Sequence, residues 1–150
     1  MEKNINKVSS GIIVNTQYVK DLSFENPKTP YSLLAEEKPE IDIVLDINAQ
    51  SVQESMFEVV LGIQVKALVK DEAQFLVDLK YAGVFTLNQE DTEKEMILLV
   101  HCPALLFPYA RRIISDLTRD GGYLPLMISL IDFLKLYNEK QTEKMNKTIN

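Results

Sequence analysis

Few side chains in this 150-residue sequence have the type and spacing that catalysis requires. The single histidine, His101, is followed directly by the single cysteine, Cys102, inside an apolar stretch. A cysteine and a histidine can act as nucleophile and base, but adjacent residues on a helix point in different directions. We therefore interpret both as packing residues, and one of each also cannot complete a tetrahedral zinc site. A small enzyme that uses this pair stays open as an alternative.

Other catalytic patterns are missing from the sequence. No glycine-rich phosphate loop occurs, and Gly121-Gly122, which follows a helical pattern, is explained as a helix cap. Acidic residues are plentiful, but no spaced pair lies in an apolar setting that would raise a carboxyl pKa for acid–base catalysis. We expect no catalytic residue, no cofactor and no metal, so the main hypothesis is a protein that is not an enzyme.

Length and charge narrow the function class further. The 150 residues, 46% of them hydrophobic, suit a single domain over residues 1–150, and the formal net charge is −6. An acidic surface disfavours nucleic acid and anionic membranes and favours a partner that carries Lys, Arg or a bound cation. The single cysteine and the lack of an apolar signal core at the N-terminus predict a cytoplasmic protein. No stretch approaches the roughly 20 apolar residues of a membrane span, so we expect no direct membrane insertion.

The elements that must position any site are read from hydrophobic periodicity. Apolar residues alternate with polar ones from Phe57 to Phe85 around a polar break at residues 70–73, which predicts an antiparallel hairpin. Residues 11–25 and 41–48 alternate in the same way and predict two earlier strands, joined by a proline-containing connection over residues 27–39. We expect these four strands to form a meander-like antiparallel sheet.

A period of three and four residues replaces the alternation after Phe85. Apolar positions from Met96 to Leu117 predict one long helix, with a break near His101–Pro103 and a kink near Pro108. A short C-terminal helix is expected over residues 133–140, and residues 1–10 and 141–150 are expected to be disordered tails. The predicted fold class is α+β, and the wide apolar surface of the long helix suggests contact with another subunit.

Two surfaces stand out, each with two open interpretations. Acidic residues on the predicted outer face of the sheet form either an ordinary solvated surface or a docking surface for a basic or metal-bearing partner. These residues are Asp21, Glu25, Asp42, Asp46, Glu58 and Asp78, beside Lys66, Lys70 and Lys80. Surplus apolar residues outside the strands are either core and oligomer contacts or a groove for apolar segments of other polypeptides. These residues are Tyr31, Leu33, Leu34, Leu126, Met127, Ile128, Leu130 and Ile131.

Four runs resemble the signature stretches of the SecB family of bacterial protein-export chaperones. They are YVKDLSFENP (18–27), YAGVF (81–85), CPALLFPYAR (102–111) and GYLPLMISLIDF (122–133), and the resemblance covers roughly residues 11 to 138. It implies a four-stranded antiparallel sheet with helices, assembled as a dimer of dimers, that is, a homotetramer. It further implies an ATP-independent cytosolic holdase that keeps precursor proteins unfolded and delivers them to the export motor SecA.

The resemblance also assigns residues. The SecA-binding residues of the family match Asp21, Glu25, Leu76 and Asp78, where Asp78 replaces a common glutamate by a shorter acid. The predicted client groove comprises Tyr31, Leu33, Leu34, Leu126, Met127, Leu130 and Phe133. The predicted oligomer interface comprises Val77, Leu79, Tyr81, Leu106, Ala110 and Ile113. The sequence departs from the family at Leu124 and Leu130, where prolines are frequent, and at Leu134, where an aspartate is.

One alternative function on the same fold remains open at this point. A SecB-like protein can instead be a chaperone dedicated to a single partner, such as the antitoxin of a toxin–antitoxin pair. A pulldown that returns one dominant client would favour this alternative over a general export chaperone.

Overall fold

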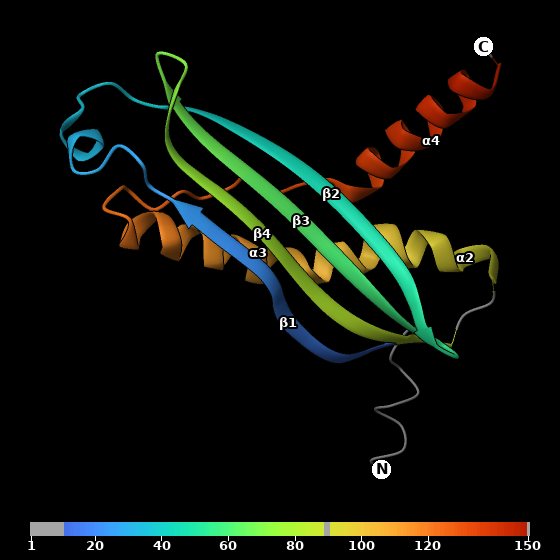
Figure 1. Cartoon of the computed structure of the whole chain (residues 1–150). Coiled ribbons are helices and arrows are strands. Elements are labelled where there is room, and N and C mark those ends of the chain that lie inside the picture. The colour runs from blue at the N-terminus through green and yellow to red at the C-terminus, as the bar shows by residue number, and fades with distance from the viewer. Residues whose placement is uncertain (1–10, 89–90, 150) are drawn as a thin grey trace.

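Alternating apolar and polar residues build a four-stranded antiparallel sheet, as predicted. The computed structural model describes residues 11–88 and 91–149. The strands are β1 (Ile12–Glu25), β2 (Glu40–Gln53), β3 (Met56–Val69) and β4 (Glu72–Leu87). The helical elements are the 3₁₀ helix η1 (Tyr31–Leu34), α2 (Asp91–Met96), the π-helical turn η2 (Ile97–His101), α3 (Cys102–Asp120) and α4 (Phe133–Ile149). In Figure 1, α2 and α3 run along one face of the sheet, and α4 extends away from the body.

The strand order corrects the predicted meander. It is β1-β4-β3-β2, so β2, β3 and β4 form a meander while β1 pairs with β4 at the opposite edge from β2. A tight hairpin needs a connection of about two to five residues. The longer segment from Asn26 to Pro39, which contains η1, instead carries the chain from one edge of the sheet to the other.

Two bulges in β1 correct the predicted faces of this strand. The register with β4 shifts between Val14 and Thr16 and again between Val19 and Asp21. Each extra residue reverses the in–out alternation downstream. Tyr18 pairs with Ala82 on the outer face, although strict alternation predicted it on the same face as Ile12.

The core lies between the inner face of the sheet and α3. Leu61, Ile63 and Leu79 point from the sheet and have no exposed surface, and neither do Leu106 and Ile114 of α3. Each such aliphatic side chain contributes about 1.5–3 kcal/mol when fully buried. This apolar layer fixes which face of the sheet remains open to solvent.

Proline explains the π-helical turn in the long helix. The predicted break near His101–Pro103 is observed as η2, where the N–H of Cys102 bonds the carbonyl of Ile97. Pro103 has no N–H to donate, so a local change in the hydrogen-bond pattern at its position costs little. The helix then continues through Pro108 to Asp120.

The C-terminal region differs from the sequence-based expectation. Helix α4 runs to Ile149, so the predicted short helix is longer and the predicted disordered tail is helical over residues 141–149. The predicted tail at residues 1–10 lies outside the described residues.

One finding bears on the expected absence of a membrane span. The helix Glu93–Asp120 is long and apolar enough to cross a membrane by length and composition alone. Half of its most apolar window is buried within the chain, where α3 covers the sheet. This burial is that of a core helix.

Candidate functional site

The outer face of the sheet brings the four predicted SecA-binding residues together. Asp21 pairs with Lys80, Ser23 with Asp78, and Glu25 with Leu76, so all these side chains leave the same face of the β1–β4 pair. Paired residues in an antiparallel ladder have their Cβ atoms about 4.5–5.5 Å apart. Asp21 and Glu25 are exposed, and Leu76 and Asp78 are half-buried. We call Asp21, Glu25, Leu76 and Asp78 the acidic patch.

Glu58 was predicted to project freely to solvent, and the structure shows that it does not. It is 7% exposed, and its carboxylate accepts hydrogen bonds from three side chains. The Tyr18 hydroxyl donates to Oε2, while Lys20 Nζ and Gln50 Nε2 donate to Oε1 at 2.7 and 3.0 Å. The hydrogen bond from Lys20, then the one from Tyr18, lowers the pKa of Glu58 below its usual value. Burial, then the bond to Glu58 and its charge, raises the pKa of Tyr18 to about 12.

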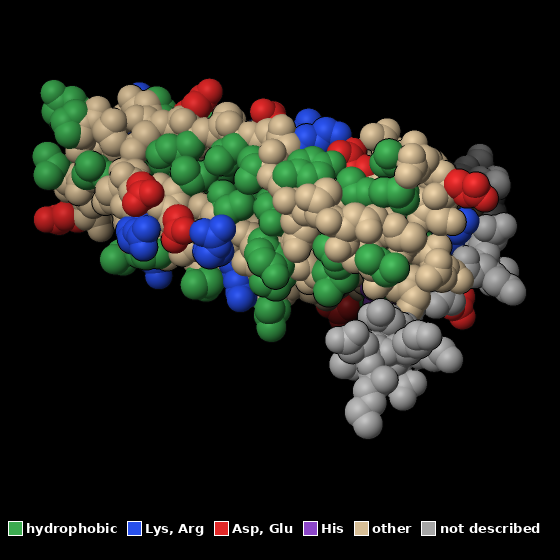
Figure 2. Space-filling model, turned by 90° about the horizontal axis from the view of Figure 1, so that it is seen from below, with side chains coloured by type: hydrophobic (Ala, Val, Ile, Leu, Met, Phe, Trp, Pro, Cys, Tyr) green, Lys and Arg blue, Asp and Glu red, His purple; other side chains and the backbone are tan. Residues whose placement is uncertain are grey.

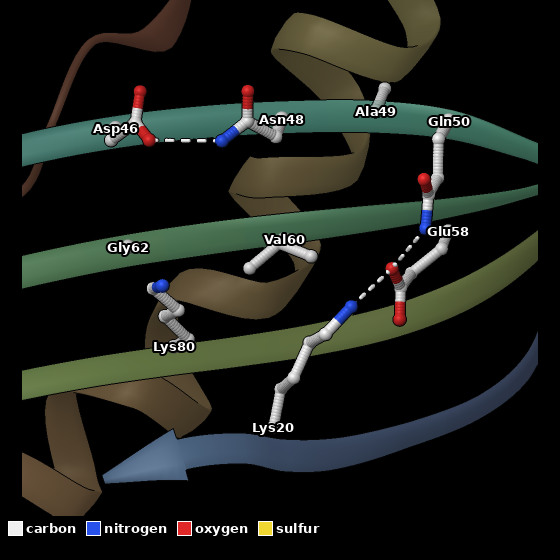
Figure 3. Close-up of a pocket in the computed structure, with 9 residues that line it drawn as sticks. All are labelled: Lys20, Asp46, Asn48, Ala49, Gln50, Glu58, Val60, Gly62 and Lys80. Atoms are coloured by element: carbon white, nitrogen blue, oxygen red, sulfur yellow. Dashed lines mark hydrogen bonds and ion pairs between the residues drawn. The ribbon is translucent and has the colours of Figure 1, made fainter.

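The Glu58 contacts connect three strands beside the acidic patch. Figure 3 shows Lys20 and Gln50 converging on Glu58 from β1 and β2, across a hollow of about 360 Å³ over β3. Val60 and Gly62 form its floor, and Lys80 stands on its β4 side. Lys20 therefore forms its ion pair with Glu58, next to the acidic patch.

The second candidate site is an apolar groove at one end of the sheet. A cavity of about 440 Å³ lies between the crossover that contains η1 and the connection from α3 to α4. Ile41, Val69 and Phe75 line it from the sheet. Leu33, Ala35 and Pro39 form one wall, and Tyr123, Leu124, Pro125 and Leu126 form the other. We call these two segments the crossover wall and the connection wall.

The predicted groove residues fall into three groups. Leu33 and Leu126 line the groove. Four others lie outside its lining but carry large exposed apolar surface: Tyr31 (78% exposed), Leu34 (78%), Met127 (64%) and Leu130 (81%). Phe133 is wrong as a groove residue, because it is 4% exposed and packs edge-on against Phe107 in the core. Sequence reasoning missed Phe75 and Tyr123, which line the groove with their ring centroids 4.9 Å apart and their planes tilted by 47°.

Most of the predicted oligomer interface is already buried within the chain. Leu79, Leu106 and Ala110 have no exposed surface, and Val77 and Tyr81 have 2% and 8%. A partner chain has almost nothing to cover there, so these are core residues between the sheet and α3. Ile113 alone in this set is partly exposed.

Apolar surface nevertheless remains on the helix side of the molecule. Figure 2 shows apolar side chains gathered along this face. Val14, Val19 and Leu22 of β1 are 43%, 46% and 37% exposed, and Leu105 and Tyr109 of α3 are 46% and 48% exposed. Contiguous patches of this kind on soluble proteins mark interaction surfaces.

Cys102 differs from an activated cysteine in both accessibility and thiol pKa. Cys102 has no exposed surface, and burial raises the pKa of its thiol to about 12. An activated cysteine has a lowered pKa and an accessible sulfur. Within residues 11–88 and 91–149, no group of three or more His, Cys, Asp or Glu residues could hold a metal ion.

Comparison with known proteins identifies the family. The profile of the family "Preprotein translocase subunit SecB" matches residues 6–144. The Protein-export protein SecB of Rickettsia felis is 49% identical over 144 residues, which is 94% of this chain and 95% of that protein. The Protein-export protein SecB of Parvibaculum lavamentivorans is 50% identical over 132 residues, 87% of this chain and 79% of that protein.

A solved structure supports the fold independently. The chain is similar to a Mycobacterium tuberculosis SecB-like chaperone, solved in complex with a ChAD peptide from an antitoxin, with a TM-score of 0.69. The two chains are 14% identical, and the match covers 84% of this chain and 95% of the other. Because the family profile and half-identical relatives both extend along nearly the whole sequence, this chain belongs to the SecB family of protein-export chaperones.

Proposed function

We propose that this protein is an ATP-independent cytoplasmic holdase that keeps precursor proteins unfolded and delivers them to SecA. The observation that carries the proposal is the apolar groove, whose lining includes the exposed side chains of Leu33 and Leu124, with exposed Leu34 next to Leu33 in the chain. Hydrophobic contact is non-directional, so such a groove accepts many sequences. A folded protein hides its apolar segments, and the groove therefore selects the unfolded state.

Removing the apolar character of the groove tests the holdase. Leu33 and Leu124 are 43% and 90% exposed, so Leu33→Asp with Leu124→Asp places charge in the groove at positions that reach solvent. The wild type should slow the aggregation of a denatured precursor at stoichiometric ratio without nucleotide, and the double variant should not. Val52→Asp, at an exposed position in β2, is the matched control. A wild type that fails with several clients while remaining oligomeric refutes the proposal.

The acidic patch is the proposed docking surface for SecA. Three carboxylates and one leucine support this proposal, because they share the face of β1 and β4 that points away from the core. A negative surface attracts a basic or zinc-bearing segment and speeds its encounter. Asp21→Ala with Glu25→Ala should weaken binding of the zinc-bearing C-terminal tail of SecA and leave client binding unchanged. Asp42→Ala with Asp46→Ala, on the same face in β2, is the control, and equal affinity in both double variants would exclude the patch.

The exposed apolar residues of β1 and α3 support assembly into a homotetramer. Leu22, Leu105 and Tyr109 expose apolar surface to water in the single chain. Association that buries this surface gains about 25 cal/mol for each Å². A mass measurement in solution should give a tetramer, and Leu105→Glu with Tyr109→Glu should give a smaller species. Leu134→Glu, at an exposed position in α4, should leave the mass unchanged.

The single-partner alternative has one supporting observation, the antitoxin peptide in the Mycobacterium tuberculosis SecB-like structure. That chain is 14% identical to this one, whereas the relatives at 49% and 50% are named for protein export. The export function is therefore the better supported of the two.

A further inference from the structure

A chain of side-chain hydrogen bonds lies directly beneath the apolar groove. Ser32 Oγ, in the crossover wall, is 2.8 Å from the Tyr123 hydroxyl in the connection wall. The Tyr123 hydroxyl donates to Asn26 Oδ1 at 2.6 Å, and Asn26 Nδ2 donates to the Gly121 carbonyl at 2.9 Å. The Gln74 carbonyl lies 3.3 Å from the same hydroxyl.

Proton counting fixes the direction of these bonds. The Tyr123 hydroxyl has one proton and gives it to Asn26, so Ser32 must be the donor in its own bond with Tyr123. Ser32 is 9% exposed, so its hydroxyl has little access to water as a replacement partner. The Tyr123 hydrogen-bond chain, from Ser32 through Tyr123 and Asn26 to Gly121, thus has every member satisfied.

This chain joins the crossover wall to the rest of the protein. The other hydrogen bonds of η1 are local, from the N–H of Ser32 to Lys28 and from the N–H of Leu33 to Pro30. Among the residues that the structure describes, the Ser32–Tyr123 bond is the only hydrogen bond from η1 to a residue outside the crossover. The bond to the Tyr123 hydroxyl is therefore the hydrogen bond that ties Leu33 and its neighbours to the connection wall.

The glycines before Tyr123 bring the two walls into contact. A Cβ atom on Gly122 would lie 2.8 Å from Leu33 Cδ2, and one on Gly121 would lie 2.6 Å from Phe24 Cζ. The Leu33 side chain thus packs directly on the backbone of Gly122, which has a φ of +95°. Close backbone approach and left-handed φ both require glycine.

We propose that Tyr123 is a positioning residue of the client groove, and that its hydroxyl, through Ser32 and Asn26, sets the distance between the crossover wall and the connection wall. The proposal rests on the proposed holdase function. A binding surface that is held in its bound geometry loses less conformational entropy when it takes up a ligand. Without the hydroxyl, the crossover wall has more conformations to lose, and client affinity falls although the apolar lining is unchanged.

The test compares groove affinity with stability in Tyr123→Phe and Ser32→Ala. The probe is a short fluorescein-labelled peptide of alternating leucine and serine, because a long client would mask the effect through multivalent binding. One net hydrogen bond is worth about 0.5–1.5 kcal/mol, so each variant should bind the peptide about 3- to 10-fold more weakly. The double variant should bind no more weakly than Tyr123→Phe alone, because that substitution already removes the bond that Ser32→Ala removes.

Tyr137→Phe is the matched control, a half-buried tyrosine of α4 outside both walls, and it should bind the peptide like the wild type. Urea unfolding separates positioning from loss of fold, since the affinity loss must persist where each variant is fully folded. Equal affinity of Tyr123→Phe and wild type overturns the inference, as do additive losses in the double variant. If the wild type itself does not bind the peptide, the proposed function fails instead.

Discussion

The substitution Glu58→Gln should destabilise the protein by about 1–2.5 kcal/mol at pH 7. Glutamine keeps the shape of the side chain and removes its charge. The Lys20–Glu58 ion pair contributes about 0.2–1 kcal/mol, because the Lys20 side chain is 43% exposed and is screened by solvent. The bond from Tyr18 to an ionised carboxylate is worth about 1.5–3 kcal/mol, against about 0.5–1.5 for a neutral amide acceptor. The acceptor difference of about 1–1.5 kcal/mol and the ion pair together give about 1–2.5 kcal/mol.

The pH dependence of this loss follows from the direction of the pKa shift. The pKa of Glu58 is lower in the folded protein than its usual value of 4.5. A lowered pKa gives stability that is present above the unfolded pKa and is lost as the pH falls through the folded pKa. The difference between wild type and Glu58→Gln should therefore be full at pH 7 and should shrink below about pH 4.5.

Urea unfolding at fixed protein concentration, at pH 7 and at successively lower pH, measures this difference. Fixed concentration matters because subunit association changes apparent stability. Glu72→Gln is the control, since the Glu72 side chain is 68% exposed and its pair with Lys28 spans 3.8 Å. A Glu58→Gln variant as stable as wild type at pH 7, or one whose deficit is the same at low pH, would refute the role assigned to the carboxylate.

Three further predictions concern α3 and the segment after it. Thr118 has no exposed surface, and its hydroxyl accepts a hydrogen bond from the N–H of Leu126 at 2.9 Å. Thr118→Val should lower the free energy of unfolding by about 1–3 kcal/mol, because it leaves that N–H unpaired. Thr142→Val, at an exposed position in α4, should change the free energy of unfolding little. Gly121→Ala should lower the free energy of unfolding by about 1–3 kcal/mol, because its Cβ atom would displace the Phe24 ring. Gly62→Ala, whose Cβ atom would meet nothing closer than 3.5 Å, should leave the free energy of unfolding nearly unchanged. Calorimetry compares the two variants, and equal effects would contradict the clash at Gly121. Cys102, with its thiol pKa near 12 and no exposed surface, should react with iodoacetamide at pH 8 only as fast as the protein opens, and a rate near that of a free thiol would show that it is accessible.

The sequence allowed the strands and the long helix to be predicted, but not how β1 joins the sheet. Period-two alternation identifies a strand by its two unlike faces, and it says nothing about which strand is its neighbour. β1 therefore looked like the first strand of a meander, although it pairs with β4. The bulges at Val14–Thr16 and Val19–Asp21 arise from that pairing, so the outer-face position of Tyr18 was not predictable from the sequence of β1 alone.

Residue type was a poor guide to which apolar side chains are available to a partner. Leu106 and Leu105 are adjacent and chemically identical, yet one has no exposed surface and the other is 46% exposed. The orientation of α3 against the sheet decides between them, and that orientation requires the tertiary structure. Tyr123 was missed for a related reason, since its partners Asn26 and Ser32 are distant in sequence. The available signal was its place directly after Gly121-Gly122.

The two candidate sites differ in how firmly their residues are held, and this difference suits their proposed roles. β4 carries Leu76 and Asp78 between β1 and β3 and is held by backbone ladders on both sides, and β1 carries Asp21 and Glu25 on the edge strand paired with β4. Such a fixed array of charges favours one partner of matching geometry. The groove walls belong to connections outside the ladder, and the crossover wall depends on the Tyr123 hydrogen-bond chain. Segments outside a ladder open at lower free-energy cost than paired strands, so the walls can adjust to clients of many sequences within the limits that the Tyr123 hydrogen-bond chain sets, while the patch keeps its shape.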